Sequence, residues 1–134
     1  MDFKDLPPQC PPAEARPAKE SERIYRLGCL KDTYSSIDFR SHWEKYPSKR
    51  SNYSSTPGEC QAKSLSVFLS EDEAHKASKL PSLKSKVNSI LSIKLEPTDG
   101  KLMQTGGNRE HHSLWLSCAF VLDKANIQVT SLYD

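Results

Sequence analysis

A short apolar stretch with the period of a strand is the clearest pattern in this chain. Leu65, Val67 and Leu69 fall on one side of an extended chain, because successive side chains of a strand alternate between its two faces. Phe68 lies on the other side and indicates that this face is partly covered as well. The pattern predicts a strand over residues 65–70 that is packed on both faces.

A helix is predicted directly after this strand. Ser70 stands three residues before Glu73, which is the spacing of a capping box, in which each side chain accepts from the backbone amide of the other residue. Acidic residues in the first turn and lysines in the last turn match the helix dipole. Apolar positions at 74, 77 and 80 form a narrow stripe, and Pro81 prevents continuation. We therefore expect a helix over residues 71–79.

Other apolar segments predict further strands. Residues 24–27 indicate a first strand that ends at Gly28. Residues 87–95 fit a helical face as well as a strand face, and we choose the strand.

The pair Asp99-Gly100 is a strong reversal signal, so residues 101–105 are expected to pair back on the preceding strand as a hairpin. Two more apolar segments, 112–122 and 127–133, complete the pattern. Together the segments predict an α+β fold, with a mixed or mainly antiparallel sheet of about five strands and one to three helices in one domain over residues 21–134.

The first 20 residues differ in composition from the rest. They hold five of the nine prolines of the chain, among charges and alanines. Such a segment buries too little apolar surface to offset the entropy lost on ordering. We expect residues 1–20 to form a disordered, flexible N-terminal arm, which would serve either as a plain tail or as a polyproline ligand.

Residues 31–59 contain scattered aromatic residues in a polar background. A connection of this length inside a compact domain is typical of a functional or mobile loop. Ser36 or Asp38 is suited to cap a short helix that carries Phe39 and Trp43 and ends at Pro47. The aromatic residues either anchor this loop to the core or stack on a ligand.

Charge and cysteine content narrow the possible functions. The net charge is only +2, so the chain lacks the strong positive field that attracts nucleic acid or an anionic membrane, and nucleic acid is disfavoured as a partner. The sequence shows neither an export signal nor a membrane-spanning segment, so we expect a cytoplasmic protein. Its four cysteines have no C-x-x-C pair and are expected to be reduced; two disulfides are the alternative.

Two adjacent histidines are the first candidates for chemistry. An imidazole gains or loses a proton near neutral pH, so His111 and His112 are candidate catalytic residues, with Trp115 as a ligand-binding neighbour. Adjacent side chains of a strand face opposite ways, so at most one histidine serves a given site. The alternative is that one is hydrogen-bonded at the sheet surface and the other is solvated.

Arginines supply the second candidate site. Arg26, with Arg40 or Arg109, would clamp a phosphate or carboxylate through the fixed fork of guanidinium donors, although surface ion pairing explains these residues equally well. Tyr25 and Ser66 are candidates for positioning the substrate, and His42 belongs to a polar cluster in the long loop. The histidines and cysteines lack the close ligand pairs of zinc sites, so no metal is predicted.

The order of parts resembles that of small ADP-ribosyltransferase-type domains. Tyr25-Arg26 follows an opening strand, and the serine-bearing strand 65–70 leads into an acidic helix. In that family an early polar residue and a later serine-bearing strand hold the nicotinamide cofactor. The late acidic or Gln-x-Glu pair of the family is absent, and Glu110 is the only candidate for it.

Two functions are therefore compared. The first is a small binding or interaction module with an unidentified macromolecular partner. The alternative is a small transferase or hydrolase that acts on a nucleotide-like or phosphorylated ligand, with Arg26 holding the anion and His112 as acid or base. Convergence of Arg26, His112, Ser66 and Tyr25 in one pocket would distinguish the enzyme from the binding module. No cofactor is identified by the sequence.

Overall fold

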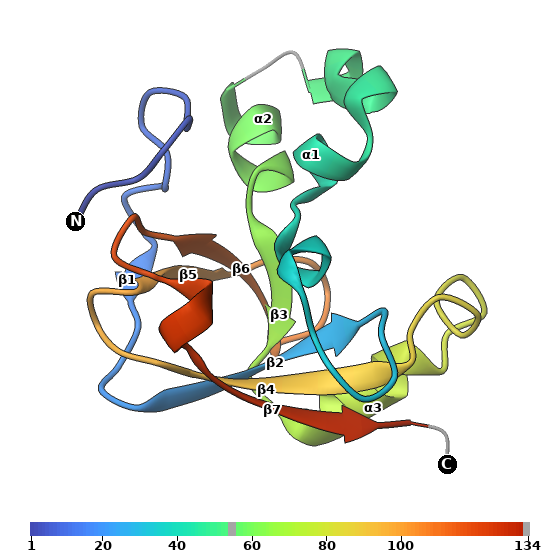
Figure 1. Cartoon of the computed structure of the whole chain (residues 1–134). Coiled ribbons are helices and arrows are strands. Elements are labelled where there is room, and N and C mark those ends of the chain that lie inside the picture. The colour runs from blue at the N-terminus through green and yellow to red at the C-terminus, as the bar shows by residue number, and fades with distance from the viewer. Residues whose placement is uncertain (54–55, 133–134) are drawn as a thin grey trace.

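The computed structural model describes residues 1–53 and 56–132 as one curved antiparallel sheet with short helices around it (Figure 1). Over these residues the sheet has seven strands in the order β1-β5-β6-β3-β2-β4-β7. This agrees with the α+β class and an antiparallel sheet, whereas the expected number of about five strands is wrong. The strands are β1 (Arg16–Pro17), β2 (Glu22–Gly28), β3 (Leu65–Phe68), β4 (Ser89–Leu95), β5 (Gly100–Gln104), β6 (His111–Leu116) and β7 (Asn126–Ser131).

The helices are short and lie mostly between β2 and β3. In Figure 1, α1 and α2 lie at one end of the molecule, beyond β3, and α3 lies at the other end, beside β2 and β4. The α-helices are α1 (His42–Lys45), α2 (Thr56–Ala62) and α3 (Glu71–Ser78), and the 3₁₀ helices are Ser36–Phe39, Pro47–Tyr53 and Leu122–Lys124.

The predicted strand and helix around Ser70 are confirmed as β3 and α3. The capping box is half formed: the Ser70 hydroxyl accepts from the Glu73 amide at 3.4 Å. The Glu73 carboxylate instead accepts from Asn108 Nδ2 at 2.9 Å and from Lys76 Nζ at 3.3 Å. Glu73 thereby joins the helix to the loop before β6. Leu80 lies beyond the last helical residue and is 51% exposed, so its expected place in the apolar stripe is wrong.

Each face of the sheet carries its own apolar layer. One layer contains Ile24, Val67 and Leu114, which are almost fully buried, and it extends over most of the strands. The other layer packs Phe68 and Ile90 against α3. Strand alternation explains this division, because Val67 and Phe68 are neighbours in β3 and point to opposite faces.

The N-terminal segment, defined here as residues 1–20, is not a flexible arm in the structure. Residues Arg16–Pro17 form β1 and pair with β5, Ala15 and Ala18 are buried, and Cys10 forms a disulfide with Cys60. In Figure 1 the segment (dark blue) runs along the side of the molecule next to β5 and β6. Composition alone predicts disorder, but the covalent link and the edge-strand pairing supply the ordering free energy that apolar burial within the segment lacks.

The hairpin predicted at Asp99-Gly100 is wrong in its partner strand. β5 pairs with β1 and β6, whereas β4 pairs with β2 and β7. The reversal itself is present, because the Asp99 carboxylate accepts from the Glu96 amide at 2.8 Å. Gly100 then lies so close to the Trp115 carbonyl that a side chain would collide with it. The absence of a side chain at residue 100 thus allows β5 to lie close against β6.

The remaining strand predictions are confirmed. β2 ends at Gly28 and β4 begins at Ser89, and the strand interpretation of residues 87–95 is therefore correct. The first part of the apolar segment 112–122 belongs to β6, and the chain leaves the sheet after Leu116. Most of the segment 127–133 belongs to β7. Tyr133 lies outside the described residues. The caps in the long loop differ from the expected ones: Ser35 caps the first 3₁₀ helix and Ser41 caps α1. Pro47 begins a further 3₁₀ helix.

Candidate functional site

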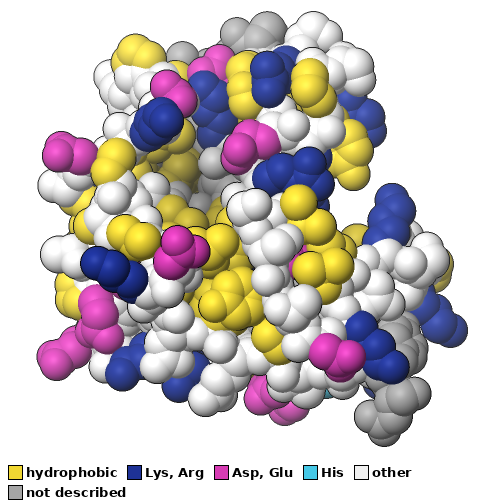
Figure 2. Space-filling model, in the orientation of Figure 1, with side chains coloured by type: hydrophobic (Ala, Val, Ile, Leu, Met, Phe, Trp, Pro, Cys, Tyr) yellow, Lys and Arg dark blue, Asp and Glu magenta, His cyan; other side chains and the backbone are white. Residues whose placement is uncertain are grey.

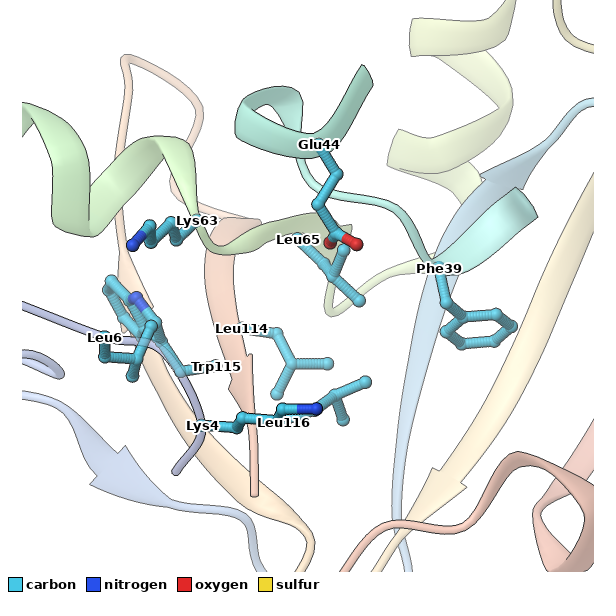
Figure 3. A pocket seen from close by; sticks show the side chains of 9 residues that line it. All are labelled: Lys4, Leu6, Phe39, Glu44, Lys63, Leu65, Leu114, Trp115 and Leu116. Atoms are coloured by element: carbon cyan, nitrogen blue, oxygen red, sulfur yellow. The ribbon is translucent and has the colours of Figure 1, made fainter. Parts of the chain in front are cut away.

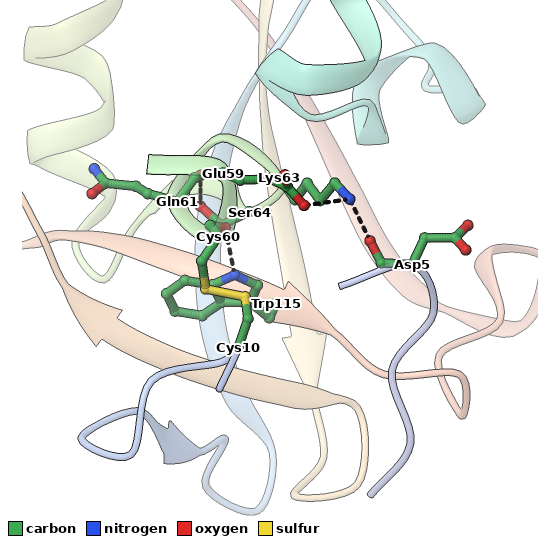
Figure 4. Close-up of a disulfide and its surroundings, with 8 residues drawn as sticks. All are labelled: Asp5, Cys10, Glu59, Cys60, Gln61, Lys63, Ser64 and Trp115. Atoms are coloured by element: carbon green, nitrogen blue, oxygen red, sulfur yellow. Dashed lines mark hydrogen bonds and ion pairs between the residues drawn. A yellow bond between two sulfur atoms is a disulfide. The ribbon is translucent and has the colours of Figure 1, made fainter. Parts of the chain in front are cut away.

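A disulfide between Cys10 and Cys60 joins the N-terminal segment to the end of α2 (Figure 4). The expectation of reduced thiols is wrong for this pair. Their Cα atoms are 5.6 Å apart, across 50 residues of sequence, a separation that gave no local signal for pairing. Cys29 and Cys118 remain as free, exposed thiols. Cys60 is 3% exposed and belongs to the buried core.

Trp115 holds this junction together from β6. Its indole N–H donates to the Cys60 carbonyl at 2.9 Å, and its ring packs with Ala15, Cys10 and Leu6. Trp115 is 2% exposed, so its indole face is enclosed by its neighbours. The indole thereby fixes both the disulfide and the N-terminal segment on the sheet.

The wall opposite the N-terminal segment comes from the helices between β2 and β3. Trp43 lies between two cations, with Arg50 at 5.0 Å and Lys63 Nζ at 4.7 Å from its ring centre. Lys63 Nζ also donates to the Asp5 carbonyl and pairs with Glu59 at 3.1 Å (Figure 4). Lys63 is therefore a bridge between this wall and the N-terminal segment.

Between these two walls lies a cleft of about 170 Å³. Figure 2 shows it as a hollow with apolar side chains in its interior, and Figure 3 shows the lining residues from close by. The floor is formed where β3 begins and β6 ends. Six of the lining residues are apolar and three are charged; the lining residues are Lys4, Leu6, Phe39, Glu44, Lys63, Leu65, Leu114, Trp115 and Leu116.

The three charged residues of the cleft differ in how far they are already engaged. Lys63 is paired with Glu59, as described above. One carboxylate oxygen of Glu44 accepts from the amide and the hydroxyl of Ser41, at 3.1 and 3.2 Å, as part of the α1 cap. The Lys4 ammonium has no ion pair among the described residues. Glu44 has no ion pair among these residues either, so Lys4 is the cation, but not the only charge, of the cleft that is available to a ligand.

A second cavity of about 260 Å³ lies beside the 3₁₀ helix Leu122–Lys124. Its two acidic residues are already used within the fold. Glu96 accepts from the Ser21 amide at 3.0 Å, and Asp99 accepts from the Glu96 amide. Its lining also includes Lys94 and Lys124, but it lacks the disulfide-linked wall of the first cleft, and we therefore take the first cleft as the candidate site.

The adjacent histidines point to opposite faces, as strand alternation requires. His111 contacts Thr105 through Nδ1, at 3.2 Å from its hydroxyl and 2.9 Å from its carbonyl, and meets the Phe68 ring edge-on. His112 is buried on the opposite face, and its Nδ1 lies 3.3 Å from the Glu110 carbonyl. Burial lowers the pKa of His112 below its ordinary value, so the imidazole is neutral at neutral pH.

Arg26 is buried and binds backbone carbonyls. Its guanidinium donates to Asp38 at 2.6 Å, to Ser66 at 2.7 Å and to Arg40 at 3.3 Å. Burial lowers the pKa of Arg26 to about 10, and the nearby Asp38 charge opposes this effect. The three bonds tie the long loop to β3 and use three of the five N–H donors, and the burial of the guanidinium keeps the other two from an outside anion.

The other predicted site residues are spread over the molecule. Tyr25 packs in the layer beneath α3, and Ser66 is exposed on the same face of the sheet. Arg40 is exposed and donates to the Ile37 carbonyl at 3.4 Å. His42 lies beside the Tyr46 ring, and its Nδ1 is 3.0 Å from the Tyr53 hydroxyl. Of all predicted site residues only Trp115 lines the cleft.

Sequence reasoning missed Lys4, Leu6, Glu44 and Lys63 as lining residues. The two that belong to the N-terminal segment were hidden by its proline content. The only available signal for them was Cys10, a cysteine in a segment otherwise expected to be disordered. Pairing with Cys60 turns this segment into one wall of the cleft.

Residues 1–53 and 56–132 show no group of three or more metal-ligating side chains that could hold an ion. Over the same part of the chain, no helix has the length and apolar character needed to cross a membrane. A cytoplasmic location stays a prediction.

The Cys29 thiol donates to Asp38 at 3.1 Å, and burial together with this carboxylate raises the pKa of the thiol.

The chain matches no protein-family model, and comparisons with curated proteins and with solved structures give no significant match. The order of parts shared with ADP-ribosyltransferase-type domains therefore stands without support from a family match.

Proposed function

We propose that the protein is a binding module whose cleft receives one large apolar side chain of a partner polypeptide, next to an acidic residue of the same partner. The observation that carries this proposal is the combination of an apolar floor with one unengaged cation, Lys4, at its side. The cleft is built by two walls that are linked covalently through Cys10 and Cys60. It is therefore held open before any ligand binds.

The size of the cleft favours a side chain over a whole small molecule. Sites for drug-sized ligands have volumes of roughly 300–1,000 Å³, whereas this cleft holds about 170 Å³. Protein interfaces commonly place one apolar or aromatic anchor in a pocket of this kind, with weaker contacts around it. The cleft thus matches the anchor pocket of a protein interface.

The charges around the floor favour an acidic neighbour of the anchor. Lys63 is paired with Glu59, so the cation of the cleft without an ion pair among the described residues is Lys4; Glu44 keeps its negative charge, with one carboxylate oxygen bonded to Ser41. An aspartate or glutamate of the partner would pair with Lys4. Such a pair at the rim contributes mainly to the rate and the orientation of association.

The alternative function, a transferase or hydrolase, gains no support from this geometry. Arg26 and His112 project to one face of the sheet, whereas Tyr25 and Ser66 project to the other, as the strand pairing shows. The donors of Arg26 bind carbonyl groups. Without convergence of these groups, a substrate could not meet an anion clamp and an acid or base together.

Selection of a random peptide library on the immobilised oxidised protein tests the proposal. Enriched peptides should share a large apolar residue flanked by Asp or Glu. Leu116→Trp should fill the cleft and raise the dissociation constant of these peptides about tenfold or more, which corresponds to about 1.4 kcal/mol of binding free energy. Lys4→Glu should selectively weaken the binding of acidic peptides. Lys31→Glu makes the same charge change at an exposed residue outside the cleft and should leave their binding unchanged.

Failure of the proposal would be visible in the same experiment. Peptides that bind Leu116→Trp as tightly as the parent protein would place the binding site elsewhere. A library that yields no enriched peptide would remove the basis for a peptide-binding module. Equal thermal stability of the variants and the parent protein establishes that a loss of binding is not a loss of fold.

A further inference from the structure

The two edges of the sheet are protected to different degrees. At one edge, β1 has only two residues, and one of them, Pro17, lacks a backbone N–H. The Pro17 carbonyl already accepts from Arg16 at 3.2 Å. Short strands and prolines prevent other chains from adding to an edge. The β1 edge is therefore closed to further pairing.

The edge formed by β7 carries none of these protections. Its six residues, Asn-Ile-Gln-Val-Thr-Ser, include no charge and no proline. Among the described residues β7 pairs with β4 alone, and its exposed and half-buried residues alternate regularly along the strand. A regular, uncharged edge strand is a template for pairing with another strand.

The hydrogen-bond pattern shows which backbone groups of β7 face outward. The Leu132 amide donates to the Asn88 carbonyl at 3.0 Å, so this pair is of the hydrogen-bonded kind. In an antiparallel ladder such pairs alternate with pairs that do not bond to each other. Counting back along the register places Gln128 and Thr130 in bonded pairs with β4. The N–H and C=O groups of Ile127 and Val129 therefore point away from the sheet.

We propose that β7 pairs antiparallel with β7 of a second copy of this chain, so that the sheets of two molecules join across a twofold axis. Ile127 lies opposite the partner's Val129, and Val129 lies opposite the partner's Ile127. Their outward backbone groups then form four hydrogen bonds. Gln128 lies on the axis and faces the same residue of the partner subunit.

Self-pairing is favoured over a foreign strand by the side chains that this register brings together. Ile127 and Val129 lie on the face of the sheet that carries the main apolar layer, so their meeting continues this layer into the second molecule. On the other face Gln128 meets its own copy, and two amides can each donate and accept. No like charges oppose each other, because the strand has none.

The closed β1 edge limits the assembly to two molecules. A twofold contact uses the same surface of both copies, so no β7 edge remains after pairing. The contact is also small, with four backbone hydrogen bonds and one row of side chains on each face. Interfaces of this size are typical of weak, reversible association, so we expect a dissociation constant in the micromolar range or weaker.

Charge exchange at Gln128 tests the proposal by sedimentation velocity over a concentration series. Gln128→Lys alone and Gln128→Glu alone should each raise the dimer dissociation constant about fivefold or more, since each places like charges opposite each other. An equimolar mixture of the two variants should restore dimerisation. Thr130→Lys is the matched control: it adds the same charge on the same exposed face, but opposite the partner's Asn126, and should leave dimerisation nearly unchanged.

A backbone variant completes the test. Val129→Pro removes an outward-facing N–H and no bond to β4, so the fold should persist, as far-ultraviolet circular dichroism would show, while dimerisation is lost. A parent chain that stays monomeric at millimolar concentration would overturn the proposal. Dimerisation of Gln128→Lys as strong as that of the parent would overturn it as well. Neither result bears on the cleft, whose variant Leu116→Trp lies on another strand.

Discussion

Opening the Cys10–Cys60 disulfide should cost the protein a large part of its stability. The bond closes a loop across 50 residues of sequence. In the chain-entropy model, a loop of this length restricts the unfolded state by about 4 kcal/mol at room temperature. The whole free energy of unfolding of a small domain is only about 5–15 kcal/mol. Reduction is therefore expected to leave a protein that is folded but much less stable.

The native contacts of the N-terminal segment decide how this loss is expressed. Without the bond the segment still has the Cys118 amide donating to Asp2, Lys63 donating to Asp5, and the pairing of β1 with β5. Residues 1–10 belong to no strand and keep only two of these hydrogen bonds and the half-buried packing of Leu6 on Trp115, so they should detach first. Trp115 would then lose its cover, and its fluorescence should move to longer wavelength before the sheet unfolds.

Urea unfolding of the oxidised protein, the reduced protein and Cys10→Ser measures this effect. With a slope typical of small proteins, a loss of about 4 kcal/mol lowers the midpoint by about 2–3 M urea. Cys118→Ser is the matched control, because Cys118 is a free thiol and its replacement leaves the disulfide intact. Equal midpoints for the oxidised protein and Cys10→Ser would refute the reasoning, and so would four reactive thiols per chain without reductant.

Ser70→Ala should lower the free energy of unfolding by about 0.5–2 kcal/mol, because it removes the α3 cap; urea curves that coincide with the parent would count against the cap. The pKa of His112 is lowered by burial, so the folded state prefers the neutral imidazole, and its contribution to stability, complete above the ordinary pKa of 6.5, decreases as the pH falls through that value. His112→Gln should flatten the stability profile below about pH 6.5, and an unchanged slope there would contradict this. Ser89→Ala should raise the melting temperature, since the buried hydroxyl has no partner among the described residues. Gly28→Ala should lower the melting temperature in the parent and less in Ser89→Ala, because an added methyl would collide with that hydroxyl; equal losses in both backgrounds would exclude the contact.

Local pattern was sufficient to predict much of the sheet. β2, β3, β4 and β7 follow from alternation and turn residues, which act within a few residues of sequence. The strand order does not follow from such signals. Gly100 shows why: a turn was predicted there, but the strand that follows pairs with β6, and this pairing joins parts of the chain that no local pattern connects. Neighbouring strands in sequence need not pair.

The candidate site was harder to predict than the fold, because its walls depend on long-range contacts. Arg26 has the residue type of an anion clamp, but its burial and three carbonyl partners give it a structural role that no local pattern reveals. Lys4 and Leu6 gain their place only through the bond of Cys10 to Cys60. The separation of His111 from His112 was predictable, since it rests on the geometry of a strand alone.

The carbonyl bonds of Arg26 make the sheet dependent on the long segment between β2 and β3. In topology this segment is an insertion, because β2 and β3 are consecutive and adjacent in the sheet. Shortening such a connection by half changes the closure entropy by only about 0.6 kcal/mol. A shortened chain would nevertheless leave a buried guanidinium without the Asp38 and Arg40 carbonyls. The length of this segment and the identity of residue 26 can therefore change only together, for example by shortening the segment and replacing Arg26 with Met in the same chain.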